Sequence, residues 1–228
     1  MNEDAYFKRQ IELWGEEKQR ALRDKKIAII GAGGLGSSLA LALGTSGIGT
    51  IDIVDFDTVS LHNIHRQIAF TLEDEGQYKA EVTAALLKKK NPFLEVHAYT
   101  LPFDQLVKEH GERYDLILDA TDNLPVRAEI NDYARSRKIP WIYASVESFN
   151  GQVCFFEEAD FKVFNISDHQ PGGIAAPIVM HIASLQANLA LRYLVGLPIV
   201  KDKLYYLYFN EEGELITQKF NMPKATTL

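Results

Sequence analysis

A glycine-rich turn is the first feature of this 228-residue chain that could perform chemistry. Residues 31–36 read Gly-Ala-Gly-Gly-Leu-Gly, between an apolar run and a stretch rich in small residues. Glycines let the backbone turn tightly and approach phosphate oxygens closely, and a helix that follows presents free N–H groups there. The pattern therefore predicts a phosphate-binding turn, and the alternative is a turn without a ligand. Its glycines are Gly31, Gly33, Gly34 and Gly36.

An acidic residue stands where the ribose of a nucleotide would need a hydrogen-bond acceptor. The apolar run at residues 50–55 predicts a second strand that ends on Asp55, and Asp57 follows closely. A carboxylate in this position accepts hydrogen bonds from ribose hydroxyls in dinucleotide-binding folds. To this point the residues fit an NAD-binding protein as well as an ATP-binding one.

Polar and basic residues beyond the second strand favour a triphosphate. Asn63, Arg66 and Gln67 lie in the run Asn-Ile-His-Arg-Gln, and Lys79 begins the next predicted helix. An NAD site binds pyrophosphate largely through backbone groups, whereas a triphosphate carries about four negative charges, which arginine and lysine neutralise well. The alternatives are a surface cation for Arg66 and a helix-start lysine for Lys79. A cation is unfavourable at that end of a helix, which favours an anion-binding role for Lys79.

A third group of polar residues follows the apolar run at residues 115–120, which predicts a further strand. Asp122 and Asn123 come directly after it, and open α/β sheets bind ligands outside the carboxyl ends of their strands. A carboxylate beside a triphosphate is repulsive unless a cation lies between them, and Mg²⁺ prefers oxygen ligands. Asp122 is therefore a candidate Mg²⁺ ligand. Alternatively, Asp122 and Asn123 only cap the next helix.

These candidate residues need a scaffold, and strand and helix patterns alternate over the first two thirds of the chain. Strands are predicted at residues 25–30, 50–55, 94–100, 115–120 and 141–147, and helices at 35–46, 79–90, 103–110 and 124–138. The second helix stops before Pro92, because proline disfavours helical geometry in the preceding residue. Apolar strands separated by helices predict a parallel, Rossmann-like sheet with helices on both faces.

The pattern changes in the last third of the chain. Residues 150–157 follow the preceding strand closely, as in an antiparallel return, and two strand patterns flank a hairpin turn at residues 210–213. A loop-like stretch at residues 158–176 precedes a long helix that begins near Pro177. We expect one α/β domain over residues 1–228, mostly parallel, with an antiparallel C-terminal extension.

Composition narrows the class of protein. The chain is 46% hydrophobic and its net charge is −7, so broad nucleic-acid binding would need a basic patch that is not evident. No run approaches the roughly 20 apolar residues of a membrane span, and the first residues lack a signal-peptide pattern. The lone cysteine, Cys154, excludes an internal disulfide and a tetrathiolate zinc site. We expect a soluble, cytoplasmic protein that binds neither membrane nor nucleic acid.

Taken in order, the short motifs resemble the ThiF/MoeB/HesA family, relatives of the adenylation domain of ubiquitin-activating enzymes. The markers are Arg-Gln-Ile, the glycine turn, Asp-Phe-Asp, Asn-Ile-His-Arg-Gln, Gly-Gln-Tyr-Lys, Thr-Asp-Asn, Asn-Gly-Gln, and Ala-Ala-Pro followed by Ser-Leu-Gln-Ala. Each is weak, but the ordered set is specific and runs from about Tyr6 to Phe220. The resemblance implies a single adenylation domain.

The resemblance also implies roles for individual residues. The glycine turn would hold the phosphates of ATP, Asp55 the ribose, and Asp122 the Mg²⁺ ion. Arg9 matches an arginine that relatives insert into the active site of the neighbouring subunit, so a homodimer is implied. The nucleotide-binding residues implied beyond the turn are Asp55, Asp57, Asn63, Arg66, Lys79 and Asn123. The implied catalytic residues are Arg9, Arg66, Lys79 and Asp122.

Relatives adenylate the terminal Gly-Gly carboxylate of a ubiquitin-like sulfur carrier, ThiS in thiamine synthesis or MoaD in molybdopterin synthesis. The resemblance implies the same reaction here, with ATP and Mg²⁺. A carboxylate is already ionised at neutral pH, so no general base is needed to make it a nucleophile. The task is to bring two anions together and to stabilise the departing pyrophosphate, which positioned cations can do.

The sequence departs from its relatives in two respects. Relatives commonly bind structural zinc through two Cys-x-x-Cys pairs, which this chain lacks, so no zinc is predicted. Many also carry a reactive cysteine before the Ala-Pro helix, a place that falls near His169 here. Cys154 lies instead in an apolar strand, where a buried thiol is usually inert. We expect the reaction to stop at the acyl-adenylate, with a separate sulfur donor and with residues 158–176 covering the carrier's tail.

Other functions remain as alternatives. A dehydratase-type ligase that cyclises a threonylcarbamoyl adenosine in tRNA is disfavoured by the acidic charge and the short C-terminal tail. An inactive partner subunit of an activating enzyme is disfavoured because Arg66, Lys79 and Asp122 are all retained. An NAD oxidoreductase would have no evident use for Arg66 or for the Thr-Asp-Asn motif.

Overall fold

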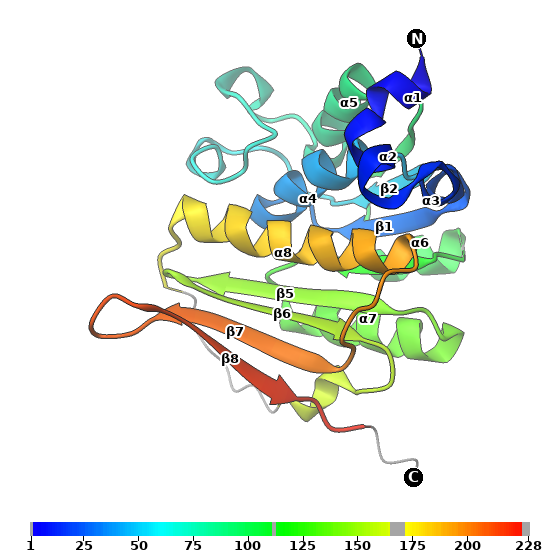
Figure 1. Ribbon diagram of the computed structural model, residues 1–228. Coiled ribbons are helices and arrows are strands. Elements are labelled where there is room, and N and C mark those ends of the chain that lie inside the picture. Colours follow the sequence, from blue (N-terminus) through cyan, green and yellow to red (C-terminus); the bar gives the residue numbers. More distant parts are fainter. Residues whose placement is uncertain (1, 111–112, 165–171, 225–228) are drawn as a thin grey trace.

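The computed structural model describes residues 2–110, 113–164 and 172–224 and contains one mixed sheet of eight strands (Figure 1). The strand order is β3-β2-β1-β4-β5-β6-β7-β8. The five parallel strands are β1 (Lys26–Ile30), β2 (Thr50–Val54), β3 (Glu95–Tyr99), β4 (Leu116–Asp119) and β5 (Trp141–Glu147). The antiparallel extension contains β6 (Asn150–Phe156), β7 (Lys203–Phe209) and β8 (Leu215–Asn221). The predicted fold class is confirmed.

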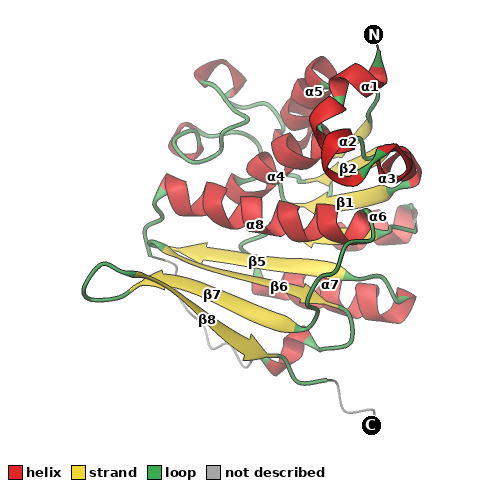
Figure 2. Cartoon of the chain, in the orientation of Figure 1, coloured by secondary structure: helices red, strands yellow, loops and turns green. Residues whose placement is uncertain are grey.

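Helices cover both faces of the sheet, and Figure 2 shows α8 on the near side and α7 on the far side. The near layer consists of α4 (Gly34–Gly44), α5 (Lys79–Lys90) and α8 (Ala176–Leu194), and the far layer of α6 (Phe103–Glu109) and α7 (Leu124–Arg137). Side chains alternate between faces along a strand. On β1, Ile27 and Ile29 accordingly join the core under the near layer, while Ala28 and Ile30 join the core under the far one.

Local signals in the sequence fix several helix ends. Helix α5 ends at Lys90, directly before the Asn-Pro pair, and α8 begins with proline in its first turn, as predicted. Asn123 caps α7, because its side-chain oxygen accepts a hydrogen bond from the Val126 amide at 3.2 Å. Of the predicted loop at 158–176, the structure describes residues 158–164 and 172–176, and the first of these stretches contains a 3₁₀ turn at Phe161–Val163.

Three short helices precede β1 and pack against the far ends of α4 and α5. They are α1 (Glu3–Tyr6), α2 (Lys8–Trp14) and α3 (Glu16–Ala21). The Tyr6 hydroxyl donates to the Lys90 carbonyl at 2.9 Å, and the Gln10 amide donates to the Ser46 carbonyl at 2.6 Å. Since these carbonyls lie at the C-terminal ends of α5 and α4, the N-terminal helices lie at the amino edge of the parallel strands. None of the described helices is long and apolar enough to cross a membrane.

Candidate nucleotide site

The candidate residues converge at the carboxyl edge of the sheet. Strand β1 lies between β2 and β4, and Ile30 is in register with Val54 on one side and Asp119 on the other. The glycine turn, Asp55 and the Thr-Asp-Asn motif therefore leave the sheet side by side. The chain order reverses between β1 and β4, which is where open α/β sheets form ligand crevices.

Two glycines of the turn are required by close backbone contacts. Gly31 has φ +95°, and a Cβ atom there would lie 2.7 Å from the carbonyl oxygen of Ala120. A Cβ atom on Gly36 would lie 1.9 Å from the carbonyl oxygen of Gly31. Helix α4 begins at once, at Gly34, so its free N–H groups face the crevice. This geometry would let a phosphate oxygen approach the backbone of the turn closely.

Asp55 ties the second strand to this turn. One carboxylate oxygen accepts a hydrogen bond from the Ala32 amide at 2.6 Å, and the other accepts from the Asp57 amide at 2.8 Å. Burial raises the pKa of the Asp55 carboxyl, while the two amide hydrogen bonds and the positive charge of Lys79 oppose that rise. Each oxygen keeps a lone pair, so Asp55 can hold the turn and accept a ribose hydroxyl as well.

Lys79 and Asp57 form an ion pair beside Asp55. Lys79 is the first residue of α5 and only 7% exposed, and its ammonium lies 3.0 Å from the Asp57 carboxylate. The pair explains why a lysine is tolerated at the positive end of a helix. It also means that Lys79 would exchange a carboxylate for a phosphate when a nucleotide binds. The Asp57 side chain is largely exposed and can turn towards solvent.

Arg66 and Asn63, which the sequence assigned to the phosphates, are held differently. The Arg66 guanidinium donates to the His62 carbonyl at 2.8 Å and contacts the His65 ring, and no described carboxylate pairs with it. Its charge is therefore uncompensated. Asn63 is 6% exposed, and its oxygen accepts from the Ser60 amide at 3.0 Å. Asn63 thus caps its own turn and shapes the segment that carries Arg66.

Of the next two candidates, Asn123 serves the fold, whereas Asp122 is left open. The Asn123 oxygen is used as the cap of α7, so the capping alternative holds for this residue. Asp122 is exposed, and its carboxylate forms no hydrogen bond or ion pair with another described side chain. An open carboxylate at the end of β4 fits the preference of Mg²⁺ for oxygen ligands and retained waters. The donor set is thus compatible with the predicted metal.

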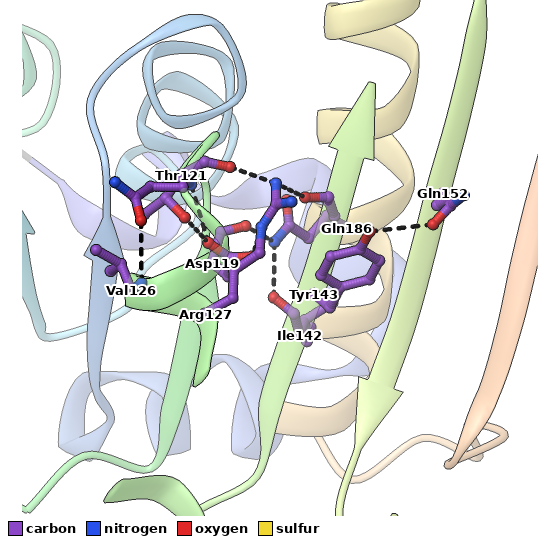
Figure 3. A network of polar contacts seen from close by, with 10 residues as sticks. Asp119, Thr121, Val126, Arg127, Ile142, Tyr143, Gln152 and Gln186 are labelled. Atoms are coloured by element: carbon purple, nitrogen blue, oxygen red, sulfur yellow. Dashed lines mark hydrogen bonds and ion pairs between the residues drawn. The ribbon is translucent and has the colours of Figure 1, made fainter. Parts of the chain in front are cut away.

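A buried network fixes the turn that carries Asp122 (Figure 3). Asp119 is fully buried and accepts hydrogen bonds from the Arg127 guanidinium at 3.1 Å and from the Thr121 amide and hydroxyl at 2.9 and 2.7 Å. Arg127 also donates to the carbonyls of Thr121 and Ala144. Asp119 is therefore a structural residue, and neither its pairing nor Arg127 was predicted from the sequence.

Gln186 joins helix α8 to the same network. Its side-chain nitrogen donates to the carbonyls of Asp119 and Ile142, at 2.8 and 2.9 Å, and the residue is fully buried. Figure 3 shows Gln186 beside Asp119, the last residue of β4, and Ile142, the second residue of β5. Sequence reasoning used Gln186 only as part of a motif. The signal that could have singled it out is a polar residue on the apolar face of a long helix.

Arg9 is a predicted site residue, but it lies away from the crevice of its own chain. It lies on α2, its side chain is 91% exposed, and it pairs with Glu12. Helix α2 packs against the C-terminal end of α4, whereas the glycine turn lies at the other end of that 11-residue helix. A helix of that length spans about 16 Å. Within one chain, Arg9 is therefore remote from the turn.

The fold is that of a Rossmann-like domain, and comparison with known proteins assigns its family. The model of the ThiF family matches residues 7–227, so the chain belongs to the ThiF family. It is 34% identical over 197 residues to the sulfur carrier protein ThiS adenylyltransferase of Escherichia coli, covering 82% of this chain and 78% of that protein. It is 33% identical over 207 residues to the molybdopterin-synthase adenylyltransferase of E. coli, covering 83% and 82%. Nucleotidyltransferase is the class of enzyme that these relatives define.

Longer relatives and solved structures complete the comparison. The chain is 30% identical to the adenylyltransferase and sulfurtransferase MOCS3 of Caenorhabditis briggsae, matching 90% of its own length but spanning 54% of that protein. A crystal structure of E. coli MccB with ATP shares the fold, with a TM-score of 0.82 and 23% identity over 98% of this chain and 72% of that one. At this identity the similarity shows the fold alone.

The Arg127–Asp119 pair gives a stability prediction. Arg127→Met should lower the free energy of unfolding by about 3–5 kcal/mol, because it leaves a buried carboxylate uncompensated. Arg135→Met is the matched control, since Arg135 lies on the same helix but forms a more exposed ion pair, with Asp160, and it should cost less than about 1 kcal/mol. Urea denaturation measures both, and equal losses would contradict the assignment.

The loss of stability in Arg127→Met should depend on pH. Burial raises the pKa of Asp119, and the charge of Arg127 opposes that rise. Without Arg127 the carboxyl should take up a proton more readily in the folded state. Since a raised folded-state pKa gives stability that is present at low pH and lost as the pH rises through that pKa, the deficit of Arg127→Met should shrink on acidification.

Proposed function

We propose that this protein adenylates the C-terminal Gly-Gly carboxylate of a ubiquitin-like sulfur-carrier protein, using ATP and Mg²⁺. The observation that carries the proposal is that the described part of the chain leaves both a cation, Arg66, and a carboxylate, Asp122, without an oppositely charged partner near the glycine turn. The negative charge of a triphosphate complements Arg66, and the Mg²⁺ ion that accompanies the triphosphate complements Asp122. The names of the relatives supply the reaction class and the carrier.

The reaction requires positioning rather than proton transfer. A carboxylate oxygen of the carrier attacks the α-phosphorus of ATP, the new C–O–P linkage forms, and the bond to pyrophosphate breaks with its electron pair on the leaving group. The N–H groups of the glycine turn and the charges of Arg66 and Lys79 hold the phosphates and offset repulsion between the anions. Mg²⁺ held by Asp122 would neutralise further phosphate charge.

Lys79 makes the crevice selective for an anion. Without a nucleotide its buried ammonium is balanced by Asp57. A phosphate that displaces the Asp57 carboxylate takes over a desolvated charge, which is a stronger interaction than one with an exposed lysine. The released Asp57 carboxylate returns to water, where it is already largely exposed.

The proposal includes a homodimer in which Arg9 serves the site of the partner subunit. Its position supports this role, because Arg9 is highly exposed yet lies at the edge of the sheet opposite its own glycine turn. An arginine with that placement can reach a phosphate only on another molecule. A closed two-fold dimer would give each site one such arginine.

The proposal also assigns sulfur delivery to a separate protein. Cys154 is completely buried, and this burial raises the pKa of its thiol, so the reactive thiolate is disfavoured. The place near His169 lies outside the described residues. The two E. coli relatives are almost equally similar, so the carrier belongs to either the thiamine or the molybdopterin route.

The central test is carrier-dependent exchange of labelled pyrophosphate into ATP. The wild-type protein should catalyse exchange only with a carrier that ends in Gly-Gly, and Asp122→Ala should lower the rate about a hundredfold or more. Asp104→Ala removes an exposed carboxylate on α6 and should retain the wild-type rate. Exchange without a carrier, or a fully active Asp122→Ala protein, would refute the proposal. Titration with NAD in place of ATP tests the oxidoreductase alternative.

Cys154→Ser tests the sulfur step separately. With a sulfur donor present, the variant should form carrier thiocarboxylate at the wild-type rate, because the thiol is enclosed by the core. Mass spectrometry of the carrier measures the product. Loss of thiocarboxylate with intact pyrophosphate exchange would show that Cys154 carries sulfur.

Mixing two inactive variants tests the placement of Arg9. Arg9→Ala and Asp122→Ala homodimers should each be inactive, whereas subunit exchange should restore about a quarter of the wild-type activity. After equal mixing, about half of all dimers contain one subunit of each variant. Each of these dimers has one intact site out of two. Glu12→Ala, which removes the surface partner of Arg9, is the control. Failure to restore activity after confirmed exchange would place Arg9 outside the active site.

A further inference from the structure

Helix α2, which carries Arg9, buries none of its seven residues. Its apolar attachments lie at its two ends, where Phe7 precedes the helix and is 3% exposed, and where the half-buried Trp14 packs against the core. Between these ends, the Gln10 amide donates to the Ser46 carbonyl beyond α4 at 2.6 Å. Because no side chain of the helix is fully inserted into the core, hydrogen bonds decide much of its position.

Gln19, on helix α3, is the buried centre of these hydrogen bonds. The residue is 5% exposed, and its side-chain nitrogen donates to the Ser46 carbonyl at 2.9 Å. Its oxygen accepts from the Trp14 indole at 3.0 Å and from the Gln10 amide at 3.2 Å. An indole N–H can only donate and a carbonyl can only accept, so the orientation of the Gln19 amide is fixed. One side chain therefore ties α2 both to α3 and to the end of α4.

The junction between α2 and α3 is a single glycine. Gly15 has φ +88° and ψ 160°, which side-chain-bearing residues rarely adopt, and a Cβ atom on it would meet nothing within 4 Å. Neighbouring side chains therefore do not constrain this residue. The hydrogen bonds from Trp14 and Gln10 to Gln19 span the junction and set the angle between the two helices. The chain leaves room for this amide, because a Cβ atom on Gly47 would lie 2.2 Å from the Gln19 nitrogen.

We propose that Gln19 is a positioning residue for Arg9, and that it acts on the active site of the partner subunit rather than on the site of its own chain. This inference rests on the proposed function, in which Arg9 crosses the dimer interface. Arg9 is next to Gln10, so a movement of α2 at that point displaces its guanidinium, which is largely exposed. A displacement of about 1 Å in a group that meets the reacting phosphates can cost about a hundredfold in rate.

Subunit mixing tests which site Gln19 serves. Gln19→Met keeps the length of the side chain and removes its three hydrogen bonds, so the homodimer should lose carrier-dependent pyrophosphate exchange by about tenfold or more. After subunit exchange with Asp122→Ala, activity should rise to about a quarter of the wild-type rate, because the intact site of the Gln19→Met chain then receives a correctly held Arg9. Mixing with Arg9→Ala should give no gain, since neither chain then supplies a well-placed arginine.

The opposite pattern would overturn the inference. If Gln19 served the site of its own chain, through α4 and the glycine turn, Gln19→Met would be rescued by Arg9→Ala and not by Asp122→Ala. Unchanged exchange in a folded Gln19→Met protein would overturn it as well. If circular dichroism shows that Gln19→Met does not fold, Trp14→Phe decides by the same mixing, because it removes one N–H donor to Gln19 and keeps an aromatic ring.

Asn91→Leu is the matched control, because Asn91 is a second buried amide that binds the end of α4. It is 1% exposed, its nitrogen donates to the Gly44 carbonyl at 2.9 Å, and its oxygen accepts from the Phe93 amide at 3.0 Å. Neither partner belongs to α2. The variant should lose stability in urea, as Gln19→Met does, but should exchange pyrophosphate at close to the wild-type rate. An equal loss of exchange in both variants would show a general effect of loosening the end of α4 and would refute the positioning role.

The outcomes distinguish the inference from the function on which it rests. If Arg9→Ala and Asp122→Ala do not complement each other, the proposed placement of Arg9 is wrong and the inference is wrong with it. If those two variants complement each other and Gln19→Met is not rescued by Asp122→Ala, the inference alone is overturned.

Discussion

The close approach of two backbones at the carboxyl edge of the sheet is the constraint on which this site depends. Gly31 leaves β1 so near to Ala120, after β4, that a single Cβ atom would collide with a carbonyl. This contact brings the start of α4 and the Thr-Asp-Asn motif to the same crevice. Parallel strands impose it, since their carboxyl ends share one edge and the chain must cross back between them. The chemistry of the site follows from which groups are left open at that edge.

Charge is distributed at this edge according to burial. The buried ions are paired in the chain itself, Arg127 with Asp119 and Lys79 with Asp57. The more accessible ones, Arg66 and Asp122, have no oppositely charged partner among the described residues. Pairing is obligatory for a buried ion, because desolvation is otherwise too costly. An accessible ion is solvated and can remain unpaired until a ligand binds. The paired ions therefore build the site, and the unpaired ones define what it binds.

Much of this arrangement could be predicted because its signals are local. The glycine turn, the acidic end of β2 and the lysine that begins α5 lie within short stretches whose periodicity also predicts the flanking elements. The cap made by Asn123 belongs to the same class, and it was foreseen as an alternative. The capping role of Asn63 also has a local signature, in the serine three residues before it. The sequence reasoning overlooked that signature because it assigned Asn63 to a phosphate.

The remaining features depend on contacts between distant segments. Nothing near Arg127 shows that its partner is the last residue of β4, and nothing near Gln186 shows that it will join β4 to β5. Whether Asp57 opposes or assists a nucleotide depends on Lys79, which is 22 residues away. Sequence patterns therefore locate a site, while tertiary packing decides which residues hold it in place.

A reaction without an acid or a base places unusual weight on that packing. When the nucleophile is already ionised, the protein can accelerate the reaction only through geometry and through charge that is in place beforehand. The buried network beneath Asp122 provides such geometry, since Arg127, Thr121 and Gln186 converge on one residue of β4 and leave its neighbouring turn little freedom (Figure 3). Helix α8 contributes Gln186 to this network, although it lies far from β4 in the sequence. Helix α8 follows the predicted cover of the carrier's tail, and through Gln186 it is hydrogen-bonded to the strand that precedes the turn proposed to hold the metal.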